Sequence, residues 1–412
     1  MFKEVYKVVT DEFIVSIVNN EINGVKTKMV EKNTVRIYKD GYIGVAGKLG
    51  NVSLEELEKE AMEKLSYKIE YPEDPTCDTK KNVTVKGDFS DVEEFYEEVE
   101  KLLNELKAAN PSFIFFDKEK LAKMGVRMEN DKGLNLKYNA SHTEFSFVFK
   151  HKESPNIIDG IIEYASFHYN REAFLEYANT ILKSYENKID HFDDGKYPVI
   201  FLENSMDYKS KFYDALNGLS FGANSSILSG KLNQKLFNDN FTLYQTNNPE
   251  DNHFGPFFDI EGTLNNDFRY NLIENGVLKA PYTSKKYARL FKLPLTGAAG
   301  GDYDDVPKIG FVDLHISPSQ KTLKELIGER KAIFVLISMG GGFTPDGKFG
   351  APIQVPLLWE NGKFLGRLPE LSVESDFYKM FGNDFIGVSK DALIENSDLR
   401  CVAMELGVKK NG

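Results

Sequence analysis

Histidine and cysteine are the side chains that most often bind transition metals, and this sequence contains six histidines and two cysteines. No two histidines are three, four or five positions apart, so no helix can present two imidazoles to a zinc ion from one face. His142 and Glu144 have the His-x-Glu spacing of zinc deaminases, but the sequence lacks the Cys-x-x-Cys that completes that signature. We therefore interpret His142 as a strand residue and predict no metal or catalytic residue from local motifs.

The cysteine and carboxylate side chains do not identify a reaction either. Cys77 lies in a polar segment, whereas Cys401 lies in an apolar run and is expected in the core. Asp259 and Glu261 alternate, so both carboxylates would lie on one side of an extended segment, where paired acids can transfer protons. No partner residue identifies a reaction for them. The acidic run at 302–305 could bind a divalent cation, although an exposed loop explains it better.

Glycine-rich stretches occur at 296–301 and 338–343, and neither is followed by the Lys-Ser/Thr of a phosphate-binding loop. Turns that require positive φ explain both stretches. Gly340, Gly341 and Gly342 allow a second interpretation, because they directly follow the apolar strand predicted at 333–337. Glycine lets another backbone approach closely, so this edge could bind an extended peptide by strand addition.

The first 150 residues carry signals for hairpins, strands and two helices. Asp40-Gly41 between apolar runs predicts a hairpin. Ser53 predicts the start of a helix that runs to about Tyr67, and Ser90 that of a helix ending at Asn110-Pro111. The polar segment 71–86 is expected to be a surface connection. Strands are predicted at 112–116, 126–128 and 134–150.

The sequence pattern changes after about residue 155. A helix is predicted at 173–185, a buried strand at 198–202 and further helices between 208 and 236. Asn275-Gly276 and Asn361-Gly362 predict two type I′ hairpins in a region rich in strands. We therefore predict an α+β fold, with an N-terminal α/β domain of antiparallel hairpins and two helices at 1–160. A C-terminal domain dominated by mixed β-sheet is predicted at 161–412.

Composition limits the environment and the partners. The 412 residues carry a net charge of −12, which argues against broad nucleic-acid binding. The longest apolar stretch, at 332–339, is far shorter than the ~20 residues of a membrane helix. The N-terminus has no apolar core typical of a secretory signal. We therefore expect a cytoplasmic protein without a membrane partner.

Several segments together resemble the TldD/PmbA family, the "modulator of DNA gyrase" proteins. The resemblance extends from about residue 10 to 390 and depends on the order and spacing of individually loose motifs. These motifs are the opening hairpin at 35–46, the turn and strand at 129–150, and the segments 258–262, 272–278, 296–297, 323–327, 333–342 and 350–364. The family resemblance implies its α+β fold, with a C-terminal sheet-rich domain of the TldD/PmbA type.

Peptidases of that family carry His-Glu-x-x-x-His on a helix and a later cysteine as a third zinc ligand. The corresponding stretch here, expected at about 212–222, contains neither histidine nor glutamate, and no cysteine lies near Gly340. This departure is similar to the PmbA/TldE branch, whose members lack the motif and pair with a zinc-bearing TldD-type subunit. The resemblance thus implies a chain with no cofactor of its own, inactive by itself, with zinc in its partner.

The leading hypothesis is therefore the non-zinc subunit of a heterodimeric metalloprotease that acts on unfolded or leader peptides. Its predicted peptide-binding residues are Phe221, Gly222, Asn224 and Ser225, together with Gly340, Gly341 and Gly342. The alternative is a self-associating binding or scaffold protein of the same fold, without protease activity. A third hypothesis, a zinc peptidase with rearranged ligands, would have to use His142, His191 and His253. The family's gyrase label is not supported by the charge or the motifs.

Overall fold

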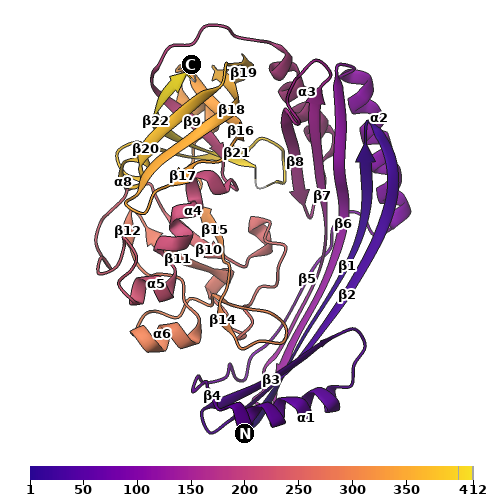
Figure 1. Cartoon of the computed structure of the whole chain (residues 1–412), viewed down its shortest axis with the longest axis vertical. Coiled ribbons are helices and arrows are strands. Elements are labelled where there is room, and N and C mark those ends of the chain that lie inside the picture. The colour runs from indigo at the N-terminus through magenta and orange to yellow at the C-terminus, as the bar shows by residue number, and fades with distance from the viewer. Residues whose placement is uncertain (398, 411–412) are drawn as a thin grey trace.

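The computed structural model describes residues 1–397 and 399–410. The N-terminal part forms a long, curved sheet, and the C-terminal part forms a second body beside it (Figure 1). Helix α1 lies at the lower end of the long sheet in this view, and α2 and α3 lie at its upper end. The predicted α+β class is confirmed.

The first sheet has eight strands, in the order β4-β3-β2-β1-β6-β7-β5, with β8 also paired to β7. Its longest strands contain 17 to 19 residues and so extend for about 60 Å. The strands are β1 (Phe2–Val18), β2 (Glu21–Lys39), β3 (Tyr42–Leu49), β4 (Ile69–Glu70), β5 (Lys80–Val85), β6 (Phe113–Asn130), β7 (Asn135–His151) and β8 (Gly160–Ser166).

The hairpin predicted at Asp40-Gly41 is confirmed, since both residues have positive φ and Lys39 pairs with Tyr42. Two other predictions for this sheet are wrong. The strands predicted at 112–116 and 126–128 are one continuous strand, β6, whose charged middle pairs with β1 on one side and β7 on the other. The segment 71–86 is more than a surface connection, because β5 within it pairs in parallel with β7.

Three helices accompany this sheet: α1 (Leu54–Lys64), α2 (Val92–Ala109) and α3 (Arg171–Glu186). Ser53 caps α1 as predicted, but Asp91 rather than Ser90 caps α2, its carboxylate accepting the N–H of Glu93 at 2.6 Å. Helices α2 and α3 bury their apolar faces on the phenylalanines of β6 and β7. Met128 and Tyr138 on the sheet pack against Phe257 and Phe258 of the C-terminal body.

The C-terminal body contains a second eight-stranded sheet, with six strands in the order β16-β9-β22-β20-β18-β17, β19 also paired to β18 and β21 also paired to β22. An additional pairing of β16 with β18 closes five of its strands into a ring. Its strands are β9 (Gly195–Leu202), β16 (Ala332–Ser338), β17 (Gly342–Phe343), β18 (Lys348–Glu360), β19 (Lys363–Arg367), β20 (Leu371–Asp376), β21 (Phe385–Ala392) and β22 (Arg400–Lys410).

Two smaller sheets and several short helices complete the body. The hairpins predicted at Asn275-Gly276 and Asn361-Gly362 are confirmed, with positive φ at all four residues. The remaining strands are β10 (Leu243–Thr246), β11 (Arg269–Glu274), β12 (Val277–Leu278), β13 (Ala299–Gly300), β14 (Lys308–Ile309) and β15 (Asp313–Ile316). The remaining helices are α4 (Met206–Ala215), α5 (Gly218–Gly222), α6 (Lys285–Phe291), α7 (Leu323–Ile327) and α8 (Phe377–Phe381), with short 3₁₀ turns η1 (Leu65–Tyr67), η2 (Pro249–Asp251) and η3 (Asn266–Phe268).

Within the described residues, the protein contains no helix with the length and apolar character needed to cross a bilayer.

Candidate functional site

Helix α4 lies beside both groups of residues that the sequence nominates for peptide binding. It is placed between β17 and α5 (Figure 1). Ser205 caps the helix, because its hydroxyl accepts the N–H of Asp207 at 3.3 Å. Phe212 anchors it to the core, with its ring centroid 4.6 Å from that of Phe381 and 4.8 Å from that of Phe377.

Two side chains of α4 fix the segment that contains the three glycines. The carboxylate of Asp207 accepts a hydrogen bond from the hydroxyl of Ser338 at 2.6 Å, just before the glycines. The buried ammonium of Lys211 donates to the carbonyl oxygens of Thr344 and Pro345, both at 3.2 Å, just after them. The glycine segment is therefore held at both ends against one helix.

Gly340, Gly341 and Gly342 all have positive φ, as the turn interpretation predicts, with values of 79°, 94° and 133°. A Cβ on Gly341 would lie 2.4 Å from the carbonyl oxygen of Gly350, so no larger residue fits there. Gly342 begins β17, which pairs with β18 and is the last strand of the sheet in the described part of the chain. The three glycines thus lead into a short strand at a sheet edge.

The second nominated group, 221–225, lies on and after α5. Asn217 caps this helix, and its side-chain oxygen accepts the N–H groups of Leu219 and Ser220. The Phe221 ring is buried in the C-terminal core, and Gly222 packs directly against the ring of Phe291 on α6. Asn224 and Ser225 are exposed. Of the four nominated residues, Phe221, Gly222, Asn224 and Ser225, only the two polar ones are exposed.

Residues Gly218–Gly222 also match Gly-x-Ser-x-Gly, the spacing of a hydrolase nucleophile elbow. In hydrolases that pattern forms a sharp turn from a strand into a helix. Here Ser220 lies inside α5, which follows another helix rather than a strand. The match is therefore a coincidence of spacing and supplies no nucleophile elbow.

A buried chain of charges adjoins α4, and no sequence motif predicts it. Glu203 follows β9 and lies 3.2 Å from Nδ1 of His315 on β15, and Lys209 of α4 lies 3.5 Å from the same carboxylate. His315 Nε2 lies 3.2 Å from Asp313, which in turn lies 3.2 Å from His253. In the sequence, only the spacing of Asp313 and His315, two residues apart on one strand, indicates that these two side chains lie on the same face. The contact with Glu203 depends on tertiary structure.

The charges in this chain stabilise one another. Burial alone would lower the pKa of His315, but the neighbouring Glu203 and the hydrogen bond with Asp313 raise it to about 10. Burial disfavours ionisation of Glu203, yet the charges of Lys209 and His315 lower its pKa overall. His315 is thus held as a cation between two carboxylates, which suits a structural ion network better than proton transfer at neutral pH.

The alternating carboxylates Asp259 and Glu261 lie in a turn, not in an extended strand. Asp259 accepts the N–H groups of Glu261, Thr263 and Ala299 at 2.8–3.0 Å. Glu261 accepts the hydroxyl of Tyr71, from the N-terminal part, and burial together with the charge of Asp259 raises its pKa to about 7. Asp259 therefore fixes the turn, and Glu261 joins the C-terminal body to the N-terminal part.

The two cysteines, the acidic run at 302–305 and His142 do not form a catalytic or metal-binding group in the described structure. Cys401 is buried as predicted, and Cys77 is exposed. The acidic run at 302–305 is a mostly exposed loop, as expected. His142 lies on β7, 3.0 Å from Glu144, with its ring stacked on Phe254. Among residues 1–397 and 399–410, no group of three or more His, Cys, Asp or Glu side chains is arranged to hold a metal ion.

Comparison with known proteins connects this architecture to a family. Residues 194–403, half of the chain, match the model of the PmbA/TldA metallopeptidase C-terminal domain. No curated protein matches the sequence. Solved structures match over nearly the whole length of both chains, at identities that show a shared fold only.

One is TldE from Thermococcus kodakarensis, with 17% identity, a TM-score of 0.80, and coverage of 100% of this chain and 97% of that chain. A second, named as a candidate modulator of a DNA gyrase from Thermotoga maritima, has 19% identity, a TM-score of 0.80, and coverage of 99% and 96%. A candidate modulator of DNA gyrase from Bacteroides thetaiotaomicron has 16% identity, a TM-score of 0.74, and coverage of 100% and 95%. With the family match over half of its length, this chain belongs to the TldD/PmbA family.

Proposed function

We propose that this protein is the non-zinc, peptide-binding subunit of a TldD/TldE-type metalloprotease that acts on unfolded or leader peptides in the cytoplasm. The observation that carries this proposal is a contrast. The chain belongs to a metallopeptidase family, but the stretch 212–222, where the zinc motif is expected, contains neither histidine nor glutamate, and it runs from the end of α4 through a turn into α5 rather than along one helix.

The donor set of α4 does not fit zinc. It offers no histidine, cysteine or glutamate, and of its two aspartates Asp207 already accepts a hydrogen bond from Ser338. Its Lys209 and Lys211 are buried cations that would repel a metal ion. Lys211 instead binds backbone carbonyls of the glycine segment. The alternative set of His142, His191 and His253 receives no support, because these residues are not gathered into a metal-binding group within the described structure. We therefore derive no zinc-dependent step in this chain.

The role left for this chain is to hold the peptide. Among the described residues the two-residue strand β17 pairs with β18 alone, so its other edge, beside α4, is the proposed place for an incoming strand. Gly340 and Gly341 are exposed and carry no side chain that would block the approach of a peptide backbone. The exposed polar residues Asn224 and Ser225, across α4, are the proposed second contact. A TldD-type homologue would supply the metal and the cleavage chemistry.

The decisive experiment is purification of the tagged chain from its native organism, with metal analysis of what accompanies it. We expect a zinc-bearing TldD-type homologue in a one-to-one complex, and cleavage of unfolded peptides by the complex but not by the isolated chain. Stoichiometric zinc in the isolated chain would contradict the proposal. A zinc-free homodimer without peptidase activity, measured by light scattering, would support the self-associating scaffold instead.

A second measurement addresses strand addition. A peptide that the complex binds is compared with the same peptide N-methylated at alternate residues, which removes N–H donors and leaves the side chains unchanged. We expect at least a roughly tenfold loss of affinity, because main-chain hydrogen bonds supply the binding in strand addition. Equal affinity of the two peptides would show that the β17 edge is not the binding element.

A further inference from the structure

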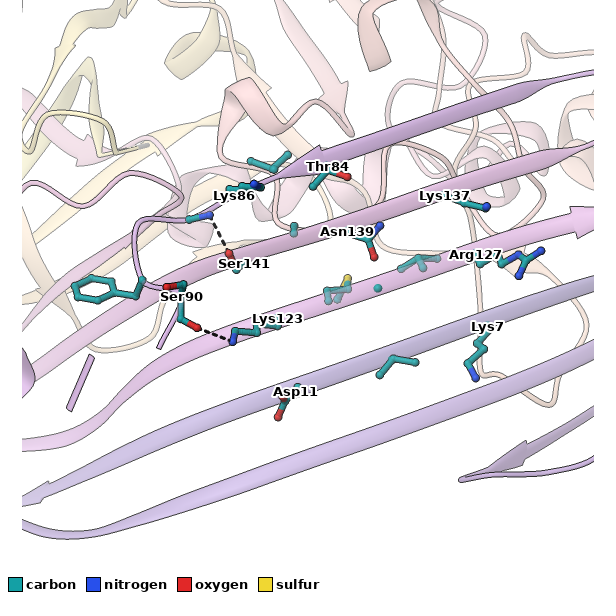
Figure 2. A pocket seen from close by; sticks show the side chains of 18 residues that line it. Lys7, Asp11, Thr84, Lys86, Ser90, Lys123, Arg127, Lys137, Asn139 and Ser141 are labelled. Carbon is teal, nitrogen blue, oxygen red and sulfur yellow. Dashed lines mark hydrogen bonds between the residues drawn. The ribbon is translucent and has the colours of Figure 1, made fainter. Parts of the chain in front are cut away.

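A hollow of about 910 Å³ lies on the face of the long sheet that is turned away from the C-terminal body (Figure 2). Alternate residues of β6 and β7, such as Met128 and Tyr138, face that body and pack on it. The intervening residues Lys123, Arg127 and Lys137 therefore face the opposite side. We call this depression the outer hollow. It lies on the long sheet rather than at the β17 edge, so binding there is independent of the peptidase assignment.

The outer hollow has two cationic ends and an open floor. At one end, Lys7, Arg127 and Lys137 lie directly opposite one another on the neighbouring strands β1, β6 and β7. At the other end are Lys123 on β6 and Lys86 just after β5, with Asp11 of β1 directly opposite Lys123 (Figure 2). Gly125 lies between the two ends on β6 and has no side chain to fill the middle, so the hollow remains continuous.

The rim near Lys86 is fixed by hydrogen bonds. The N–H of Gly87 donates to the hydroxyl of Ser141 at 2.9 Å, and the ammonium of Lys123 donates to the carbonyl oxygen of Ser90 at 3.1 Å (Figure 2). These bonds hold the connection between β5 and α2 along one side of the sheet. The hollow is therefore bounded by ordered backbone and is more than a flat sheet surface.

The placement of the cations is unfavourable for the free protein. Like charges directly opposite each other on neighbouring strands destabilise a sheet. Glu31 lies 2.6 Å from Lys7, and Glu129 lies 2.5 Å from Arg127, which offsets two of the charges. Lys86, Lys123 and Lys137 have no carboxylate partner within 4 Å in the described part of the chain. In a protein of net charge −12, this concentration of unpaired cations favours an anionic ligand.

The spacing of the charges favours one class of anion. Lys123 and Arg127 are four residues apart on one strand, so the two cationic ends are separated by about 13 Å. A single phosphate or carboxylate cannot reach both ends. An extended peptide places side chains four residues apart at the same separation. Asn139 and Thr84, exposed between the ends, can form hydrogen bonds with its backbone amides.

A nucleic acid fits less well. Its charges cannot be spaced to avoid Asp11, which lines the hollow, and the neighbouring carboxylates Glu31 and Glu129, whereas a peptide with carboxylates four residues apart can place uncharged residues between its charges. We propose that the outer hollow binds an extended acidic peptide segment whose carboxylates pair with the cationic residues at its two ends.

The test measures fluorescence anisotropy of a labelled peptide in which glutamate recurs at every fourth position in a Ser/Gly background, with glutamine replacing glutamate in the reference peptide. The full chain should bind the glutamate peptide more tightly by roughly tenfold at low salt, and the difference should shrink as salt is added. The double variant Lys123→Glu/Lys137→Glu should remove the preference. The matched control Lys59→Glu/Lys331→Glu changes the net charge equally at exposed lysines elsewhere and should retain it.

The neutral variant Lys123→Gln/Lys137→Gln should give an intermediate affinity and a thermal midpoint close to that of the wild type, which separates lost binding from lost folding. Equal binding of the two peptides would overturn the proposal, as would equal losses in the hollow and control variants. Tighter binding of a thymidine oligonucleotide than of the glutamate peptide, lost in the hollow variant, would also overturn it in favour of a nucleic-acid site.

Discussion

The ammonium nitrogen of Lys211 lies 3.2 Å from the carbonyl oxygen of Thr344. A cation in the middle of a helix thereby fixes the segment that follows three consecutive glycines. Buried lysines require compensating hydrogen bonds, and Lys211 obtains two from backbone carbonyls rather than from a carboxylate. One end of the proposed peptide edge is therefore held by Lys211, as the other end is held by Asp207.

Replacing Lys211 with methionine should loosen that edge. Methionine keeps an unbranched apolar stem and loses the charged donor, so we expect the free energy of unfolding to fall by about 1–2 kcal/mol. Hydrogen exchange should become faster at residues 339–347, while the distant hairpin at Asp40-Gly41 should be unaffected. The exposed Lys331 provides the control, because Lys331→Met removes an ammonium without such contacts. Unchanged exchange at 339–347 would show that Lys211 does not fix the segment.

Gly340 and Gly341 form a natural pair for separating backbone strain from steric exclusion. Both have positive φ, but a Cβ on Gly340 meets nothing within 4 Å, whereas one on Gly341 meets the backbone of Gly350 and Ala351. Gly340→Ala should cost about 1 kcal/mol in urea unfolding. Gly341→Ala should cost roughly 1–3 kcal/mol more, because the β18 backbone must move. Equal costs would indicate that the close approach to β18 is relieved without strain.

The parts of the fold that the sequence predicts well are turns and helix starts, which depend on a few neighbouring residues. Asn275-Gly276 and Asn361-Gly362 need no distant partner to form their turns, and Ser53 needs only the helix that it caps. The continuity of β6 was not predictable from its own residues. Its charged middle resembles a loop until β1 and β7 pair with it on both sides. The same holds for β5, whose parallel partner lies more than fifty residues away.

The candidate site also contains parts that neighbouring residues predict and parts that depend on tertiary structure. The position of Gly340–Gly342 after an apolar strand predicted a turn into an edge, and the structure has one there. Burial of Phe221 could not be inferred, because an aromatic residue in a five-residue helix shows no periodicity. Glu203 and His315 are 112 positions apart, and only the packing of β15 against the end of β9 and α4 brings them within 3.2 Å.

His315→Gln should change how stability depends on pH. The pKa of His315 is raised to about 10 in the folded state, against about 6.5 in an unfolded chain. The folded state therefore binds more protons between these values, so the stabilisation is fully present below pH 6.5 and is lost as the pH rises through about 10. The difference in unfolding free energy between wild type and variant should be largest below pH 6.5, where it should reach about 3 kcal/mol.

Urea unfolding of both proteins from pH 6 to pH 10 measures this effect, with His168→Gln as the control because His168 is exposed and pairs with Asp88 at the surface. The control difference should stay small throughout. A His315→Gln difference that is constant across the range would mean that the histidine contributes by packing on Tyr244 and not through its charge.

Glu119 should produce a separate pH dependence. Its side chain is fully buried, one carboxylate oxygen accepts the N–H of Ser146 at 2.6 Å, and the other has no hydrogen-bond partner in the described structure. Burial raises the pKa of Glu119 to about 8. The folded state therefore retains a proton that the unfolded chain releases near pH 4.5, and stability contributed by this group falls as the pH rises from about 4.5 to about 8.

Glu119→Gln cannot ionise, so relative to wild type it should gain on the order of 3 kcal/mol between pH 5 and pH 9 in urea unfolding. The exposed Glu329→Gln should gain nothing over that range, and an equal response of both variants would show that Glu119 is solvated in the folded protein.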